Sequence, residues 1–263
     1  MNAIADWFSS VFQKLGEMGL TDWISVGALL VLGGILFIVA RITGKWTARM
    51  LSYAAVSIAL SFVLSFIRLF RMPQGGSVTP GSMLPLLLFA AAYGAGPGML
   101  AGLCYGLLQY LQGGWFLNVF QLLLDYPIAF AMLGLAGLYK HLQKKWQTVA
   151  ALALPGLLMI LLIIQSPDNW ILYGCMLAVV LYLMGDVLVH PQNGTLFPAL
   201  VLAVIGRAVS AVAAGIMWLS ADGQTQGLVG ASLIYNGAYL VPEAVICLIL
   251  ARLCGNRLLK YMK

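Results

Sequence analysis

The sequence predicts an all-α integral membrane protein, a helical bundle of about nine transmembrane helices. Two observations lead to this fold class. Hydrophobic residues make up 62% of the 263-residue chain and charged residues only 8%, whereas a soluble domain carries about 25% charged residues. The apolar residues also form continuous runs close to the roughly 20 residues that a helix needs to cross a bilayer. Continuous runs favour helices over a β-barrel, whose strands alternate apolar and polar residues.

The candidate spans follow one another with only short loops between them. They are 23–40, 50–69, 82–95, 98–111, 117–138, 149–165, 169–187, 197–219 and 229–253. The third and fourth are short for a full crossing, and the glycine-rich piece between them allows only a tight turn. No linker of domain length is visible, so we expect no soluble domain of any size.

Basic residues indicate the orientation of the bundle. They cluster after the first, fifth and ninth spans: Arg41, Lys45 and Arg49; Lys140, Lys144 and Lys145; Arg252, Arg257, Lys260 and Lys263. With nine crossings the clusters share one side, which the positive-inside rule makes the cytoplasm. We therefore expect a multi-pass protein of the bacterial cell membrane, with its N-terminus outside and its C-terminus in the cytoplasm. Arg68 and Arg71 fall outside, against the trend. The net charge of +6 marks topology and does not indicate a nucleic-acid partner.

The usual signatures of enzymes are missing from the sequence. There is no P-loop, so we expect no ATP hydrolysis by this chain. His141 and His190 are loop residues far apart, and no cluster resembles a metal site or a nucleophile–base pair. The cysteines lie in or beside apolar runs without metal or disulfide spacing: Cys104, Cys175, Cys247 and Cys254. We predict no catalytic residue, no metal and no cofactor.

Three ionisable residues inside the predicted spans require a functional hypothesis, because charges in a membrane are costly. Asp125 lies about eight residues, or roughly 12 Å, inside the outer end of its span, and Asn236 lies at a similar depth. Arg207 and Glu243 lie deeper and near each other's level. For these two, a structural ion pair is the favoured interpretation.

Two tryptophans on the outer side, Trp115 and Trp218, join Asp125 and Asn236 in one outer group. A carboxylate, an amide and indole faces suit a flat, cationic, nitrogen-rich ligand. The alternative is that both tryptophans belong to an interfacial belt and Asn236 bonds between helices. Tyr235 and Tyr239 are equally compatible with packing and with contacts in such a pocket.

Small residues repeat at helical spacing along three stretches. They are Gly94, Gly98, Gly102 and Gly106; Ala55 and Ala59; and Ser57, Ser61 and Ser65. Such faces allow two helices to approach closely. Packing inside this bundle is favoured for any one stripe, and docking to another membrane subunit is the alternative.

Two stretches resemble a known family. Residues 72–83, MPQGGSVTPGSM, and residues 124–137, LDYPIAFAMLGLAG, are similar to the thiamine-specific substrate-binding (S) component of energy-coupling-factor transporters. Residues 235–239, YNGAY, with Trp218 upstream, resemble the last two helices of that family. The resemblance covers about 49–140 and 201–257. It implies a six-helix bundle, here formed by 48–140 and 197–263, with an extra helix in 1–47 and an inserted pair in 141–196.

The resemblance also implies residue roles. Thiamine would bind near the outer surface beneath the loop at about 70–82. The positions that match substrate contacts are Asp125, Tyr126, Trp115, Trp218, Asn236, Tyr235 and Tyr239, and Ala55 and Ala59 match the pair that docks to the coupling subunit. Asp125 stands where the family typically has Glu. Ser210 and Ala231 stand where the family has a pocket histidine and a pocket tyrosine.

We therefore expect a high-affinity thiamine-binding membrane subunit of an ATP-driven vitamin importer. Its partners would be thiamine, the lipid bilayer, a transmembrane coupling subunit and two ABC-type ATPase subunits that hydrolyse ATP. One alternative is the same class of subunit with a related pyrimidine, a thiamine precursor or another vitamin as ligand. Another is a stand-alone secondary transporter that uses Asp125, Arg207 and Glu243.

Overall fold

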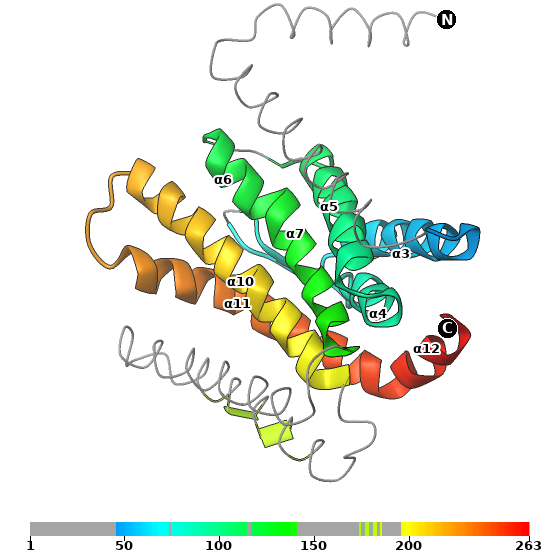
Figure 1. The fold of residues 1–263 in the computed structure, drawn as a ribbon. Helices are drawn as coiled ribbons and strands as arrows, with labels where there is room; N and C mark the ends of the chain where they lie inside the picture. The colour runs from blue at the N-terminus through cyan, green and yellow to red at the C-terminus, as the bar shows by residue number, and fades with distance from the viewer. Residues whose placement is uncertain are drawn as a thin grey trace, which may run out of the picture.

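The computed structural model describes residues 46–73, 75–114, 117–140 and 196–262, with six single residues between 174 and 185. Its elements are α3 (Ala48–Phe66), β1 (Phe70–Arg71), β2 (Ser77–Val78), α4 (Leu84–Tyr93), α5 (Ala95–Leu111), α6 (Val119–Leu123), a π-helical segment (Leu124–Ile128), α7 (Ala129–Ala131), a 3₁₀ segment (Met132–Lys140), α10 (Leu196–Ala221), α11 (Leu228–Leu250), a second π-helical segment (Ala251–Gly255) and α12 (Asn256–Met262). Figure 1 shows α10 and α11 side by side, with the helix from α6 through α7 packed on α10.

The spans predicted at 50–69, 82–95, 98–111, 117–138, 197–219 and 229–253 each fall on a helix. Four helices of the described part are long and apolar enough to cross a membrane: Ala48–Phe66, Val119–Leu138, Pro198–Ala221 and Leu228–Gly255. The predicted spans 23–40 and 149–165, and all but six residues of 169–187, lie outside the described residues. The total of nine and the four-part division of the chain therefore stay predictions. The purely α-helical expectation misses one feature, a two-stranded hairpin in the loop after α3.

Helix α4 lies at the centre of the bundle. It contacts α3, α5, α10, α12 and the 3₁₀ segment, and Leu86, Leu87, Phe89 and Ala90 are at most 1% exposed. A helix that is apolar on all sides must be enclosed by others. Its ten residues cover only about 15 Å, so α4 serves as core and does not cross a bilayer by itself.

The glycine stripe of α5 packs inside the bundle. A Cβ on Gly102 would overlap the Phe130 carbonyl oxygen, and a Cβ on Gly106 would come within 2.5 Å of the Tyr126 carbonyl oxygen. Gly98 likewise faces Ala90 and Gly134. Helix α5 can therefore lie directly on the backbone of the helix formed by residues 119–140. This use of the stripe is the packing interpretation, and it leaves these glycines no face for another subunit.

A proline interrupts the helix formed by residues 119–140. The helix begins with reciprocal caps, because Asn118 Oδ1 accepts from the Gln121 N–H and Gln121 Oε1 accepts from the Leu117 N–H. Pro127 has no N–H and its ring cannot sit against the carbonyl one turn earlier. The helix widens to a π-helical segment at Leu124–Ile128. Such bulges are frequent at functional sites, and this one contains Asp125.

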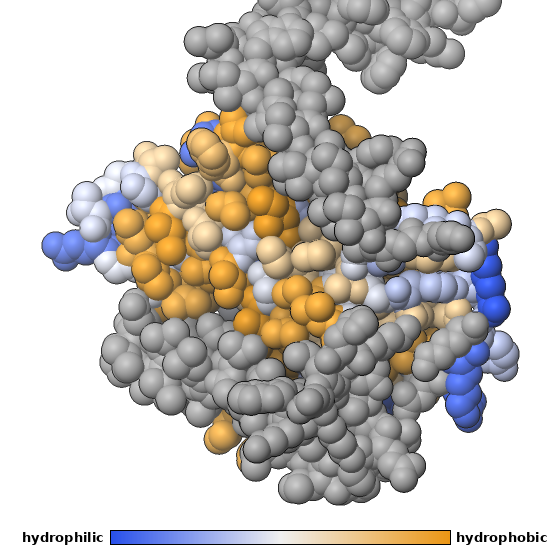
Figure 2. Space-filling view, in the orientation of Figure 1, coloured by the Kyte–Doolittle hydropathy of each residue, from blue (hydrophilic) through white to orange (hydrophobic). Residues whose placement is uncertain are grey.

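Polar residues gather at two opposite ends of the described bundle. Figure 2 shows hydrophilic surface at the loop between α10 and α11 and beside the start of α3 and the end of α12, with apolar surface over α6, α7 and α10 between them. At the second end, Arg49 and Tyr53 donate to the Tyr261 carbonyl oxygen at 2.7 and 3.0 Å. Tyr93 donates to the Met262 carbonyl oxygen at 2.7 Å. These bonds satisfy carbonyls at the end of α12 and fasten it to α3 and α4.

Helix α3 has one inner and one outer face. Its inner face is Met50, Ala54, Ser57, Ser61 and Ser65, all buried. Ala55 and Ala59 lie on the exposed face together with Leu51, Val56, Leu60 and Val63, which are 48–62% exposed. The two small-residue patterns of this helix therefore point in different directions, with the serines inside the bundle and the alanines outside.

Gly102→Ala is expected to lower the free energy of unfolding by about 1–3 kcal/mol, because the added methyl group meets a backbone oxygen that moves only with its helix. The melting temperature of the detergent-solubilised protein, followed by circular dichroism, measures this. Cys104→Ala, at an exposed position of the same helix, is the control and should melt like the wild type. Equal melting temperatures for all three proteins would contradict the close approach of α5.

Candidate functional site

The loop between α3 and α4 folds back onto α11. Its strands pair antiparallel, with Phe70 opposite Val78 and Arg71 opposite Ser77, and the Met72 N–H donates to the Gly76 carbonyl oxygen at 2.6 Å. We call β1, β2 and the turn between them the hairpin lid. The Gly76 N–H donates to the Tyr235 hydroxyl oxygen at 3.1 Å. A Cβ on Gly76 would lie 2.6 Å from the Tyr239 ring, so glycine allows the lid to rest on that ring.

Tyr235, Tyr239 and Glu243 form a stripe on α11 at intervals of four residues, and therefore share one face. Tyr239 packs with Val78 of the lid and with Ala211 of α10, and the Tyr235 and Tyr239 rings are 6.0 Å apart. The sequence is equally compatible with both tyrosines packing within the bundle and with both contacting a ligand. In the structure they form the surface on which the lid rests.

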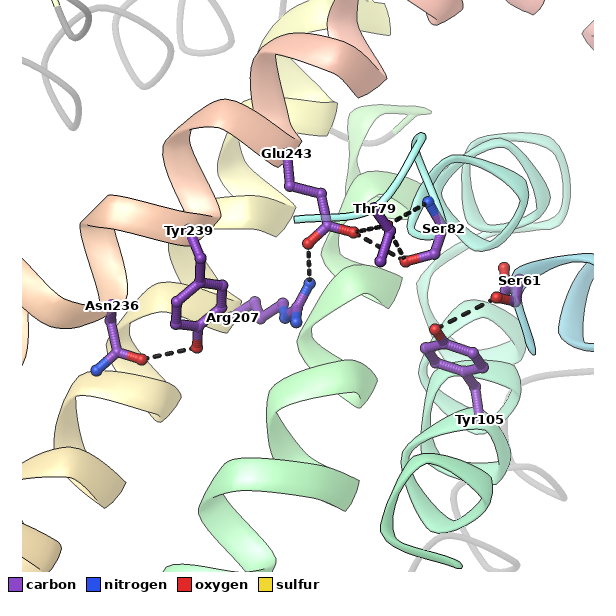
Figure 3. A network of polar contacts seen from close by, with 8 residues as sticks. All are labelled: Ser61, Thr79, Ser82, Tyr105, Arg207, Asn236, Tyr239 and Glu243. Atoms are coloured by element: carbon purple, nitrogen blue, oxygen red, sulfur yellow. Dashed lines mark hydrogen bonds and ion pairs between the residues drawn. The ribbon is translucent and has the colours of Figure 1, made fainter. Parts of the chain in front are cut away.

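The third member of the stripe, Glu243, is 1% exposed and lies within a polar network (Figure 3). Its Oε1 accepts from the Thr79 hydroxyl at 2.5 Å and from the Ser82 hydroxyl at 2.8 Å. Its Oε2 lies 3.5 Å from Arg207 Nη1. The Arg207 guanidinium carbon also lies 4.4 Å from the centre of the Phe130 ring. Glu243 therefore joins α10, α11 and the chain just after the lid.

Asn236 is buried between α10 and α11. Its Nδ2 donates to the carbonyl oxygens of Ser232 at 2.9 Å and of Ala211 at 3.3 Å, and its Oδ1 accepts from the Tyr239 hydroxyl at 2.7 Å. Gly215 of α10 allows the two helices to approach closely at this level, since a Cβ there would collide with Ser232 Oγ of α11. In the structure, the amide predicted to face a ligand bonds between helices.

Asp125 lies half-buried in the π-helical segment. Gln121, one turn earlier, donates its Nε2–H to Asp125 Oδ2 at 2.5 Å. The carboxylate is close enough to Arg207 and to Tyr239 to interact with both electrostatically. Ser210 of α10 donates to the Leu124 carbonyl oxygen at 2.6 Å, which fixes the backbone next to Asp125.

Other predicted site residues lie elsewhere or outside the described part. Tyr126 turns toward α5, where its ring lies 5.5 Å from that of Tyr110 and close to Gly114. Trp218 is half-buried, seven residues after Ala211 on α10, which places it on the same face and about 10 Å further along the axis. Trp115 lies outside the described residues, and Ala231 is half-buried on α11.

Sequence reasoning missed Gln121, Thr79 and Ser82. For Gln121 a signal exists, because it precedes Asp125 by four residues and so shares its helix face. For Thr79 and Ser82 no local signal points to Glu243, which is 164 and 161 residues away. Among the described residues no group of His, Cys, Asp or Glu could hold a metal ion. The described side chains of the site offer charge, hydrogen bonds and aromatic faces.

Comparisons with known proteins agree on one family. A family model described as thiamine transporter protein (Thia_YuaJ) matches residues 51–262. The thiamine transporter ThiT of Bacillus subtilis (strain 168) is 36% identical over 94 residues, which are 35% of this chain and 48% of that protein. The matched part thus spans about half the length of that relative. A solved structure described as native-SAD phasing for ThiT from Listeria monocytogenes aligns with a TM-score of 0.54 and 19% identity, covering 81% of this chain and 96% of that one.

Tyr239→Phe is expected to destabilise the α10–α11 pair by about 1–3 kcal/mol, because it leaves the buried Asn236 carbonyl oxygen without its donor. Thermal unfolding in detergent without ligand measures the change. Tyr261→Phe removes the same atom from a residue that is 73% exposed and should be silent. If the two variants melt at the same temperature, the Tyr239–Asn236 hydrogen bond does not stabilise the helix pair.

Proposed function

The chain belongs to the thiamine transporter family, and from that premise we propose that it is the thiamine-binding membrane subunit of an ATP-driven importer. The observation that carries the proposal is the family match across 51–262, which includes the lid, the acidic π-helical segment and the tyrosine stripe. The proposed subunit binds thiamine from outside and delivers it inward with partner subunits. It performs no covalent chemistry, and ATP hydrolysis takes place in the partners.

The proposed binding group is built around Asp125. Its carboxylate is held by Gln121 through one oxygen, which leaves the other oxygen to accept a hydrogen bond from an exocyclic amine. Trp218 and Trp115 supply aromatic faces for a cationic ring. Tyr235, Tyr239 and Asn236 complete the proposed group, and Tyr126, whose ring turns toward α5 in the structure, would have to rotate to join it. For Asn236 to bind ligand through Oδ1, the Tyr239 hydroxyl must share that oxygen or turn away from it.

The hairpin lid is proposed to cover the ligand. It follows the end of α3 and rests on the tyrosine face in the middle of α11. In the proposed topology the end of α3 faces outward and the basic residues around α12 face the cytoplasm. Thiamine would enter while the lid is displaced, and closure over Tyr235 and Tyr239 would then separate it from water.

Coupling to partners is proposed to use the outer face of α3. Ala55 and Ala59 lie one turn apart on an exposed apolar face, and small residues at this spacing allow a second helix to approach closely. The proposed neighbour is the transmembrane coupling subunit, which in turn joins two ABC-type ATPases. The extra segments 1–47 and 141–196 would stand outside this six-helix core.

Two rival functions are separated by specific observations. A pyrimidine or a thiamine precursor is the first alternative ligand. It is favoured by two residues, because the Ser210 hydroxyl already donates to the Leu124 carbonyl oxygen and Ala231 offers only a methyl group. A secondary transporter that relays protons through Glu243 is disfavoured, because that carboxylate accepts two hydroxyl bonds and an arginine contact within the bundle. Uptake by vesicles containing this chain alone, driven by a proton gradient, would restore the second rival.

Thiamine is expected to quench the tryptophan fluorescence of the purified protein saturably, and Asp125→Asn should weaken binding by roughly 10- to 100-fold. That is the loss expected when a charged hydrogen bond of about 1.5–3 kcal/mol is removed without a change of shape. Asp222→Asn, in the exposed loop after α10, makes the same chemical change away from the proposed site and should bind like the wild type.

The same titration with competitors decides between ligands. If the pyrimidine half of thiamine displaces a fluorescent thiamine analogue as well as thiamine does, the result favours a pyrimidine or thiamine precursor as the ligand. Tighter binding of riboflavin than of thiamine would reject the thiamine proposal. Asp125→Asn and Asp222→Asn proteins with equal affinity would reject the proposed role of Asp125.

The double substitution of Ala55→Leu and Ala59→Leu is expected to reduce co-purification with coexpressed coupling and ATPase subunits at least roughly tenfold, because larger side chains hold the two helices apart. Thiamine binding by the isolated variant should be unchanged. Val209→Leu enlarges a side chain that is 61% exposed on another helix, α10, and serves as the control. Full co-purification of the double variant would place the docking surface elsewhere.

A further inference from the structure

The lid and the chain that follows it run along one face of α11 for about 22 Å, at 1.5 Å per residue over residues 235–250. Gly76 lies on Tyr235 and Tyr239. Thr79 and Ser82 bond to Glu243. Gly81 lies against Leu250 and Cys247, with a Cβ position 2.9 Å from Leu250 Cδ1. Contacts with α11 therefore continue along the chain from the tip of the lid to the start of α4.

These contacts differ in strength. The bond at the tip joins a backbone N–H to a neutral hydroxyl. At the base, two hydroxyl groups donate to one buried carboxylate oxygen (Figure 3). Hydrogen bonds to a charged group are roughly twice as strong as neutral ones, and a low-dielectric surrounding strengthens them further. The strongest polar contact described between this chain segment and α11 is therefore at Glu243, beyond the lid itself.

We propose that Glu243 is a clasp that holds the hairpin lid closed, and that Arg207 is a positioning residue that aims the clasp. Arg207 contacts Oε2 of Glu243 and so leaves Oε1 to the hydroxyl groups of Thr79 and Ser82. Its guanidinium is itself supported by the Phe130 ring. An ion pair that served only to join α10 and α11 would not need Thr79 and Ser82, which belong to neither helix.

The geometry also indicates where the lid would pivot, which is between β2 and residues 81–83. Between the clasp partners Thr79 and Ser82, Gly81 has φ +91°, a conformation that favours glycine, and after them Met83 is fully buried at 0% exposure. Residues 81–83 are thus fixed to the core. Before the clasp, the lid touches α11 through Gly76 and Val78. Release of Thr79 from Glu243 would therefore free β1 and β2 to swing while α4 stays in place.

The ligand-free test is amide hydrogen exchange of the lid. In the wild type, the Leu69, Met72 and Gly75 N–H groups are hydrogen-bonded within the lid, and Gly76 N–H is bonded to Tyr235. Thr79→Val keeps the shape of the side chain and removes one donor to the clasp, together with the oxygen that accepts from the Ser82 N–H. We expect the Gly76 amide to exchange roughly tenfold faster in this variant, and amides in the middle of α10 to be unchanged.

Ser61→Ala is the matched control, because Ser61 is 0% exposed and its hydroxyl has no hydrogen-bond partner among the described residues. Ser82→Ala is a second lid-side variant should Thr79→Val fold poorly. Accelerated exchange in α10 as well as in the lid would mean a general loss of stability and would reject the clasp. Lid exchange equal in Thr79→Val, Ser82→Ala and the wild type would also reject it.

A second readout rests on the proposed function. If thiamine lies beneath the lid, Thr79→Val should release it roughly tenfold faster in a stopped-flow chase, with the association rate changed much less. An unchanged release rate with faster lid exchange would place the ligand outside the lid and so count against the proposed function alone. Normal thiamine release together with unchanged lid exchange would overturn the clasp and leave the proposed function intact.

Discussion

A carboxylate buried in an apolar bundle is the constraint on which the site depends. Moving an ionised group out of water is so costly that Glu243 must be paired and hydrogen-bonded wherever it is buried. In this chain the partners come from three places, Arg207 on α10 and the Thr79 and Ser82 hydroxyls after the lid. Satisfying one side chain therefore sets the positions of two helices and of the loop that leads into the central helix α4.

Close backbone contact positions the acidic segment from the opposite side. Gly102 and Gly106 of α5 lie on the carbonyls of Phe130 and Tyr126, and Ser210 of α10 donates to the Leu124 carbonyl. The π-helical segment is thus held on both flanks, next to a proline that prevents it from closing into a regular helix. Asp125 owes its place to these backbone contacts, and Gln121 then sets the direction of its carboxylate.

Hydropathy alone predicts the helices, because length and apolar content are what the bilayer selects. Depth along the spans also places Arg207 near Glu243, whose side chains form an ion pair in the structure. The lid contacts lie beyond this reasoning, since nothing local to Thr79 or Ser82 indicates a partner more than 160 residues away. The direction of Tyr126 is similarly hidden, because this residue lies within the π-helical segment, where side chains depart from the ideal 3.6-residue period.

The kinds of contact decide which part of the molecule is able to move. Glycine against backbone, as between α5 and the helix formed by residues 119–140, leaves no gap that water or ligand could enter, and α4 is enclosed on every side. The lid and the residues just after it instead meet α11 through hydrogen bonds, the contact of Gly76 with the Tyr239 ring and a small apolar cluster that includes Val78. When such a hydrogen bond opens, hydrogen bonds to water replace it. The net cost in free energy is therefore only about 0.5–1.5 kcal/mol for a neutral pair and more for a charged one. Opening is therefore confined to the hairpin, and its rate depends most on the one charged contact at its base.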